Sequence, residues 1–427
     1  MSRLVSSTQV QIMQHAVHNR ATIRVANRTD VSGRVTANEV NLDRFHNRIG
    51  KVCASVAATS KVYLSAATMI LGLGLVLAFL SNTSLAQFKR TNLTSNQFGH
   101  ATNDDPLIVN AWGMARSAVS PWWISDNMSG WSTLYDGNGV KVALNVSILP
   151  ATPGDIGSPT GIVSNTSTAG EFAGAPFIFV TLDGTVAAWE PGVTRSPAQI
   201  VVPPAGGASF TGLAITANPK GTPNFLFAAD NANNVIDIFD GNFVLRGTFA
   251  ADPNIPTGPN GFSVNGIRDI NGTVFVAFAA NNGGAGGFVD TFKEDGTLIG
   301  TFAQGAPLNQ PWGFAVAPGN FGPLSNTLLI SNNVNNTGTI NGFDPTTGKF
   351  VATLTRHGRP INIDQLWAID FGGGASNVTP SANGLNNELF FTAGPHNNVA
   401  GTFGKIRFVG DADDGADDHD QDHDHDQ

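Results

Sequence analysis

Short apolar runs separated by polar turns recur along most of the chain. Residues 113–136, 212–240 and 313–344 each begin with a Gly and a first apolar run, and continue through a loop to a second run that ends in Asp-Asn or Asn-Asn. A third run follows and ends in Asp. Runs of this length fit strands that are buried on both faces. A repeat built from several short strands is typical of a β-propeller blade, so the pattern predicts an all-β propeller.

Six segments align on the first of these strands, and the central residue of each is small. The aligned triplets are Trp112-Gly113-Met114, Thr160-Gly161-Ile162, Thr211-Gly212-Leu213, Asn265-Gly266-Ile267, Trp312-Gly313-Phe314 and Trp367-Ala368-Ile369. From Gly113 onward the central residues are 48, 51, 54, 47 and 55 positions apart. Innermost strands crowd around a propeller axis, where Gly or Ala lets neighbouring backbones approach. We therefore expect six blades; a seven-bladed ring would require a further blade that the alignment does not contain.

The remaining strands follow each opening strand at a regular offset, as in the second strands Trp122–Ser125 and Phe177–Thr181. The sixth segment has no outer strand, because the chain becomes acidic after Phe408. Residues Gln87–Leu93 are expected to fill that place and to close the ring, which would remove an exposed sheet edge. The predicted fold class is an all-β, six-bladed β-propeller closed by an N-terminal strand and preceded by a hydrophobic export or anchor helix.

An uncharged apolar run of nineteen residues, Val62–Leu80, precedes the propeller. Its length suffices to cross a bilayer, and Arg48, Lys51 and Lys61 lie before it. Ser84-Leu85-Ala86 offers small residues to a signal peptidase. The segment therefore predicts export to the periplasm or the outside, either with cleavage after Ala86 or with retention as a membrane anchor. A buried core helix is the less favoured interpretation, because basic residues precede the run and polar residues follow it.

Charge and composition divide the chain into four parts. Residues 1–61 form a basic extension without an assigned fold, residues 62–86 a signal peptide or signal anchor, residues 87–410 the propeller and residues 411–427 a tail. The tail has nine Asp and no Lys or Arg, while the whole chain has a net charge of −9. The propeller is mildly acidic, so no nucleic-acid surface is expected. The only cysteine is Cys53, which excludes an intrachain disulfide.

The third segment resembles a known repeat. Residues 228–240, AADNANNVIDIFD, are similar to the NHL-type propeller repeat. NLTSNQFGHA at 92–101 and DPLIVNAWGMA at 105–115 resemble an uncharacterised family of secreted bacterial propellers, some members of which carry a PEP-CTERM-type sorting tail. The resemblance covers roughly residues 88–408 and implies the fold rather than a chemistry. The sorting motif is absent here, and an Asp/His tail stands in its place.

A ligand site is expected at the mouth of the channel formed by the first residues of the opening strands, since many loops converge there. The side chains predicted to line this mouth are Asn110, Trp112, Asn265, Arg268, Gln310, Trp312, Gln365 and Trp367. Indole rings stack well on flat ligands or sugars. The alternative is that the three tryptophans plug the ring between blades.

Asp-Asn or Asn-Asn pairs recur at the end of the second strand, namely Asp126-Asn127, Asp230-Asn231 and Asn332-Asn333. Such side chains bond to nearby backbone, and we expect them to set the turn to the third strand. Ligation of a hard cation such as calcium is the alternative. The turn role is favoured, because one metal would need these separate blades to converge.

The leading hypothesis for function is a non-catalytic binding or interaction module, without a cofactor, for an unknown extracellular ligand or protein partner. Contact with a membrane is expected only through residues 62–80, if they are not cleaved. The alternative is a lactonase-like hydrolase with a divalent ion in the channel, which requires carboxylate ligands and a base. Glutamate is scarce in the propeller region, with only Glu171, Glu190, Glu294 and Glu388.

The tail, residues 411–427, has no apolar side chain suited to a core and is expected to be disordered. His419, His423 and His425 lie among its aspartates and predict weak binding of a divalent metal. A purely solubilising tail is the alternative.

Overall fold

The computed structural model describes strands β1 (Val25–Thr29) and β2 (Val35–Asn38) and residues 87–167, 170–192, 196–216, 224–374 and 382–410. The chain divides into two compact units, Met1–Thr83 and Ser84–Gln427. In the first unit, β1 and β2 pair as an antiparallel hairpin. The apolar run Val62–Leu80, the cleavage position at Ala86 and the tail histidines all lie outside the described residues. Within the described ranges, no helix has the length and apolarity to cross a bilayer.

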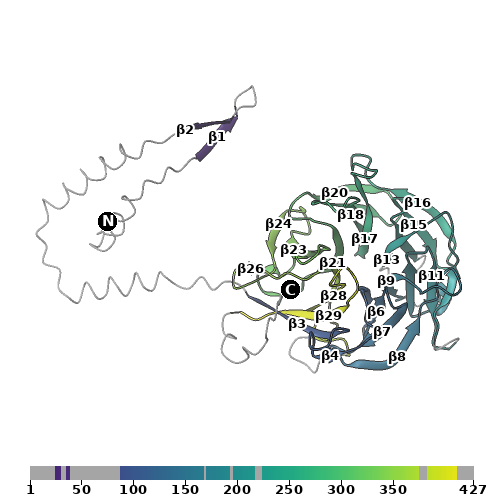
Figure 1. Ribbon diagram of the computed structural model, residues 1–427. Coiled ribbons are helices and arrows are strands. Elements are labelled where there is room, and N and C mark those ends of the chain that lie inside the picture. The colour runs from purple at the N-terminus through teal and green to yellow at the C-terminus, as the bar shows by residue number, and fades with distance from the viewer. Residues whose placement is uncertain are drawn as a thin grey trace, which may run out of the picture. The chain divides into compact units, whose positions relative to one another are not determined.

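Six sheets surround a common centre in the second unit (Figure 1), which confirms the six-bladed all-β propeller. The first blade contains β5 (Ala111–Ala115), β6 (Trp122–Asp126), β7 (Trp131–Tyr135) and β8 (Lys141–Ser147). The second contains β9 (Pro159–Ser164), β10 (Phe177–Thr181), β11 (Val186–Trp189) and β12 (Gln199–Val202), and the third β13 (Phe210–Ile215), β14 (Phe225–Asp230), β15 (Val235–Asp240) and β16 (Leu245–Ala250). In each of these three blades the first strand along the chain is the innermost one.

The fourth blade contains β17 (Phe262–Ile270), β18 (Thr273–Ala280), β19 (Phe288–Lys293) and β20 (Leu298–Gln304). The fifth contains β21 (Pro311–Val316), β22 (Leu328–Asn332), β23 (Ile340–Phe343) and β24 (Phe350–Thr353). The sixth contains β27 (Leu366–Phe371), β28 (Glu388–Ala393) and β29 (Thr402–Phe408), followed by β3 (Phe88–Ser95) and β4 (Asn103–Asp104) from the start of the unit. A small pair, β25 (Thr355–Arg356) and β26 (Arg359–Pro360), connects the fifth blade to the sixth.

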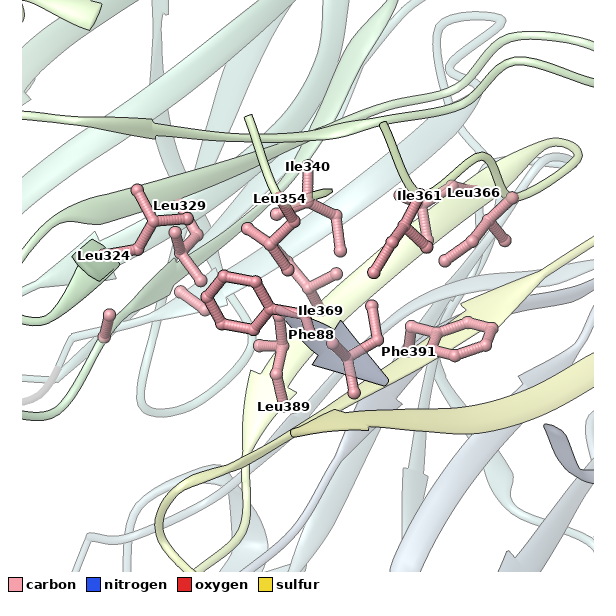
Figure 2. Packing of buried hydrophobic residues seen from close by; sticks show 14 of the residues in the cluster. Phe88, Leu324, Leu329, Ile340, Leu354, Ile361, Leu366, Ile369, Leu389 and Phe391 are labelled. Carbon is pink, nitrogen blue, oxygen red and sulfur yellow. The ribbon is translucent and has the colours of Figure 1, made fainter. Parts of the chain in front are cut away.

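The sixth blade is built from both ends of the unit, and its strands β3 and β29 lie side by side in Figure 1. These two strands pair antiparallel from Phe88 opposite Phe408 to Ser95 opposite Thr402. Phe88 is 1% exposed, and its ring lies 5.0 Å from that of Phe321 in the fifth blade. Figure 2 shows it among aliphatic side chains of the fifth and sixth blades. The N-terminal strand therefore contributes to the packing between two blades as well as to sheet hydrogen bonding.

The small residues of the opening strands lie where neighbouring blades touch. A Cβ atom added to Gly266 would lie 1.9 Å from the carbonyl oxygen of Trp312, and one added to Gly113 would lie 2.2 Å from that of Thr160. No Cβ atom fits at such distances without a shift of backbone. Glycine at these two positions therefore allows the close approach of inner strands, as the sequence predicts.

The paired Asp and Asn residues at the ends of the second strands have two distinct roles. The first residue sets the turn, as when the Asp126 carboxylate accepts hydrogen bonds from the backbone N–H and hydroxyl of Thr133. The second residue fastens the next blade. Three side-chain amides donate to an inner-strand carbonyl of the following blade: Asn127 to Pro159 at 3.2 Å, Asn231 to Val264 at 2.7 Å and Asn333 to Leu366 at 3.2 Å. The recurrence of Asn thus reflects a bond between blades in addition to the predicted turn.

A pH dependence of stability is expected from Asp237 on β15. Burial raises the pKa of this carboxyl to about 6, and the nearby charge of Asp230 contributes. The folded state then keeps a proton that the unfolded state loses above about pH 4, so stability falls from pH 4 to pH 6. The substitution Asp237→Asn removes this loss. We expect its Tm to rise relative to the wild type between pH 4 and 7, measured by thermal unfolding.

Asp240, on the same strand, provides a control of opposite sign. Burial alone would raise the pKa of its carboxyl, but hydrogen bonds from the N–H groups of Val244 and Asn242, together with the ion pair to Arg246, lower it. Its stabilising effect is present above about pH 4 and is lost as the pH falls further. Asp240→Asn is therefore expected to lower Tm at pH 7. If the Tm of both variants changes with pH in the same way relative to the wild type, burial does not raise the pKa of Asp237 as described.

Candidate functional site

The three tryptophans at the starts of the opening strands are buried and pack together. Trp112, Trp312 and Trp367 are 7%, 8% and 7% exposed, respectively. The rings of Trp112 and Trp367 stack at a centroid distance of 3.7 Å, and that of Trp312 meets Trp367 edge-on at 6.0 Å. Rings that cover each other have little free face for a ligand, and this packing matches the alternative of a plug between blades. Their role in ligand binding stays a prediction.

The polar candidates at this end of the channel are hydrogen-bonded to the protein. Asn110 accepts a bond from the Trp367 indole N–H at 3.0 Å, and Asn265 donates to the Pro311 carbonyl at 2.9 Å. Gln310 donates to the Gly284 carbonyl at 2.8 Å, and Gln365 donates to Asn335. Asn110, Gln310 and Gln365 also have a left-handed φ of 49°, 52° and 47° immediately before their strands. These bonds give all four residues a structural role at the channel start.

A central cavity of about 230 Å³ lies further along the channel, and all six inner strands contribute to its wall. Trp312 and the small residue Gly113 line it toward the strand starts, while Arg116, Ser164 and Arg268 come from the strand ends. Apolar side chains line part of its wall, including Ile162, Leu213, Ile267, Phe314 and Ile369, and polar atoms contribute nearly as much of its surface. The cavity thus combines an apolar body with a charged mouth, which is the usual composition of a small-molecule site.

An ion pair crosses the mouth of this cavity. The Arg268 guanidinium, from the fourth blade, donates through Nη2 to Oδ2 of Asp370, from the sixth blade, at 2.9 Å. Their side chains are 39% and 20% exposed. The other Asp370 oxygen accepts the backbone N–H of Phe371 at 2.8 Å. Because the fifth blade lies between the fourth and the sixth, this pair links sheets that are not neighbours. Arg268 belongs to the predicted binding set, and its charged guanidinium lies at this mouth.

A second guanidinium, that of Arg116, lies at the same mouth. It donates through Nε to the carbonyl of Phe371 at 2.8 Å, and its Cζ lies 5.5 Å from the ring centroid of Trp122. Burial lowers the pKa of Arg116, the charge of Asp370 raises it and the charge of Arg268 lowers it. The charges of Arg116, Arg268 and Asp370 therefore interact at this mouth, although only Arg268 forms an ion pair with Asp370.

Acidic side chains also lie at this mouth. Asp269 follows Arg268 on β17 and lines the cavity. Burial raises the pKa of Glu294, and the negative charge of Asp269 raises it further, so these two carboxyls are close enough to interact. The mouth thus carries charges of both signs, since Arg116, Arg268, Asp269 and Asp370 all line the cavity.

This donor set does not suit the divalent ion of the hydrolase alternative. A metal at the mouth would be repelled by Arg116 and Arg268, and Asp370 is already paired with one of them. In the part of the chain that the structure describes, no group of three or more His, Cys, Asp or Glu side chains is placed to hold a metal. The backbone N–H of His396 bonds to Asp364, and neither residue lines the cavity.

A second, more open hollow of about 600 Å³ lies at the outer part of the first two blades. Trp131, Leu149, Pro150, Ile156 and Ile200 contribute to its lining, and Asp155 is its only charged residue among those described. It draws on two sheets rather than six, and it lacks convergent polar groups. We therefore take the central cavity as the candidate site.

Comparisons with known proteins identify relatives without an assigned activity. The chain is 27% identical over 355 residues to an uncharacterised protein of Acanthamoeba polyphaga mimivirus, covering 78% of this chain and 83% of that protein. A second uncharacterised mimivirus protein is 28% identical over 305 residues, covering 66% and 78%. No family model matches. These relatives are viral, so the expected bacterial origin and sorting-tail kinship stay predictions.

Solved structures with a similar trace are distant. One is virginiamycin B lyase from Staphylococcus aureus, with 13% identity and a TM-score of 0.43, covering 76% of this chain and all of that one. Another is the PQQ-bound aldose sugar dehydrogenase from Streptomyces coelicolor, with 12% identity and a TM-score of 0.45, covering the same shares. Likeness at this level carries no information about the chemistry of the present chain.

Arg116, Ser164 and Asp370 were not among the predicted site residues, although the aligned repeats contain a signal for them. Charged or hydroxyl side chains stand two or three positions after the small central residue in the first, second, fourth and sixth segments, while the third and fifth have apolar residues there. Polar residues at the end of an otherwise apolar inner strand indicate the mouth of the channel at the strand ends, on the side away from the tryptophans. The predicted set instead lies mainly at the strand starts, where the three tryptophans stand.

Proposed function

We propose that the protein is a non-catalytic binding module that takes up a small ligand in the central cavity, through the mouth formed by Arg116, Arg268 and Asp370. The observation that carries this proposal is the convergence of three charged side chains, from the first, fourth and sixth blades, on one cavity that all six blades line. Hydrogen bonds within the protein already orient these side chains, since Arg116 donates to the Phe371 carbonyl and Arg268 donates to Asp370. Such preorganisation lowers the entropy cost of binding.

The cavity is expected to respond to small ligands through Trp312, which lines it, and not through Trp131 in the outer hollow. Incorporation of 5-fluorotryptophan gives each of the seven tryptophans its own ¹⁹F resonance, assigned by single Trp→Phe variants. We expect members of a fragment panel to shift the Trp312 resonance of the full chain. The control variant Ser164→Phe places a large ring at the mouth and should suppress these shifts. Ligands that move only Trp131, or that ignore Ser164→Phe, would refute the proposal.

We further propose that β3 latches the ring that encloses the cavity. Support comes from its pairing with β29 and from the Thr94 hydroxyl, which donates to the Gly139 carbonyl of the first blade at 2.7 Å. The strand thereby contacts the blades on both sides of the junction between the sixth and the first.

Export of the propeller is also our proposal, and it is supported by the apolar run Val62–Leu80 with its basic flank. Fractionation of producing cells, followed by N-terminal sequencing of the protein, tests it directly. Cleavage after Ala86 would yield a mature protein that begins at Gln87. A cytoplasmic protein that retains residues 1–86 would contradict export.

A further inference from the structure

Resting on the proposed function, we infer that the ligand of the central cavity is a small monocarboxylate with an apolar, ring-sized body. Its carboxylate would lie between Arg116 and Arg268, and its body would extend along the channel toward Trp312. Nothing in the comparisons assigns a ligand of this class to the chain or to its relatives.

The charged head of the ligand follows from the donors at the mouth. Arg116 uses Nε for the Phe371 carbonyl and Nη1 for that of Ser117 at 3.4 Å. Among the described residues, Nη2 of Arg116 has no hydrogen-bond partner. Planar guanidinium groups favour carboxylates, which accept two parallel bonds. A partly buried cation that forms no ion pair with Asp370 gains from an added anion.

The single charge follows from the carboxyls around the same mouth. Asp370 already offsets Arg268 at 2.9 Å, and Asp269 adds a second carboxyl to the lining of the cavity. The lining therefore carries two guanidinium groups and two carboxyls, so a dianion such as phosphate would meet more repulsion from the carboxyls than a monocarboxylate would. Ser164, at the end of β9, also lines the mouth and places a hydroxyl near the bound head.

The apolar body follows from the size and the walls of the cavity. A cavity of about 150 Å³ holds benzene, and pockets for drug-sized ligands begin at about 300 Å³. The present cavity, at about 230 Å³, lies between these values and fits a single ring with a short polar head. Ile162, Leu213, Phe314 and Trp312 supply apolar and aromatic wall surface for that ring.

Benzoate and benzamide provide a matched pair of probes, because they share a ring and differ in charge. Isothermal titration of the full chain at low ionic strength is expected to give an affinity for benzoate at least tenfold higher than for benzamide. Arg116→Gln should reduce benzoate affinity to the benzamide level, and Ser164→Phe should remove binding of both. Thermal unfolding checks that each variant is folded. The comparison of benzoate with benzamide uses the wild-type protein alone, so it does not depend on the folding of any variant.

The outcomes separate the ligand class from the proposed function. Equal affinities that Ser164→Phe abolishes would overturn the carboxylate inference and leave the central cavity as the binding site. If benzoate does not bind while other fragments shift the Trp312 resonance, the carboxylate inference is likewise overturned and the central cavity remains the binding site. Benzoate binding that Ser164→Phe leaves unchanged would overturn both proposals, since the ligand would then lie elsewhere.

Discussion

Gly266→Ala is expected to prevent stable folding of the propeller, with a loss of more than about 4 kcal/mol in the free energy of unfolding. The new Cβ would lie 1.9 Å from the carbonyl oxygen of Trp312 and 2.7 Å from its carbonyl carbon. Both atoms are backbone of an inner strand, so no side-chain rotation relieves the contact. The fourth and fifth blades would have to separate at the hub. Urea unfolding of the full chain, or soluble yield if the variant does not accumulate, measures the effect.

Gly247→Ala is the matched control for this prediction. Gly247 lies on the outer strand β16, and an added Cβ would meet no heavy atom within 4 Å. The same chemical change should therefore alter stability by less than about 1 kcal/mol. Similar effects at positions 247 and 266 would mean that the inner strands do not approach each other as described.

Phe88→Ala is expected to destabilise the propeller by about 3–5 kcal/mol, which is the usual cost of removing a buried phenyl ring. The ring is 1% exposed and lies 5.0 Å from Phe321 and 5.5 Å from Phe408. Figure 2 places it inside the cluster between the fifth and sixth blades. Loss of this contact weakens the attachment of β3, and equilibrium unfolding in urea should show a lower midpoint.

Phe98→Ala serves as the control, because that ring lies just after the same strand and is 92% exposed. It should leave the midpoint almost unchanged. Hydrogen exchange of the β29 amides provides a second readout, since these pair with β3. If Phe88→Ala leaves both the midpoint and this protection at wild-type levels, the latch proposal is wrong.

The sequence predicted the blades well because their strands are short, apolar and regularly spaced. The predicted strand Phe177–Thr181 coincides with β10, and Trp122–Ser125 differs from β6 by one residue. Strand β3 extends to Ser95, beyond the predicted end at Leu93, because pairing with β29 continues across the polar residues Thr94 and Ser95. A short apolar run signals a strand by itself, whereas these polar residues are strand because they pair with β29, which is distant in sequence.

The site was harder to predict, because it depends on which end of the channel remains open. Trp112 and Trp367 have the composition of a ligand platform, and no local pattern indicates that their rings stack on each other. The pairing of Arg268 with Asp370 joins residues 102 positions apart in non-adjacent blades. Such a contact follows from the curvature of the whole ring. A repeat alignment finds the charged positions, but only the three-dimensional arrangement brings them to one mouth.

A crystal structure of the full chain with benzoate tests the position of the ligand most directly. We expect the carboxylate at about 3 Å from the guanidinium nitrogens of Arg116 and Arg268, with the ring inside the cavity toward Trp312. Benzoate bound beside Trp131, or with its carboxylate at Asn110 and Gln365 near the strand starts, would contradict it.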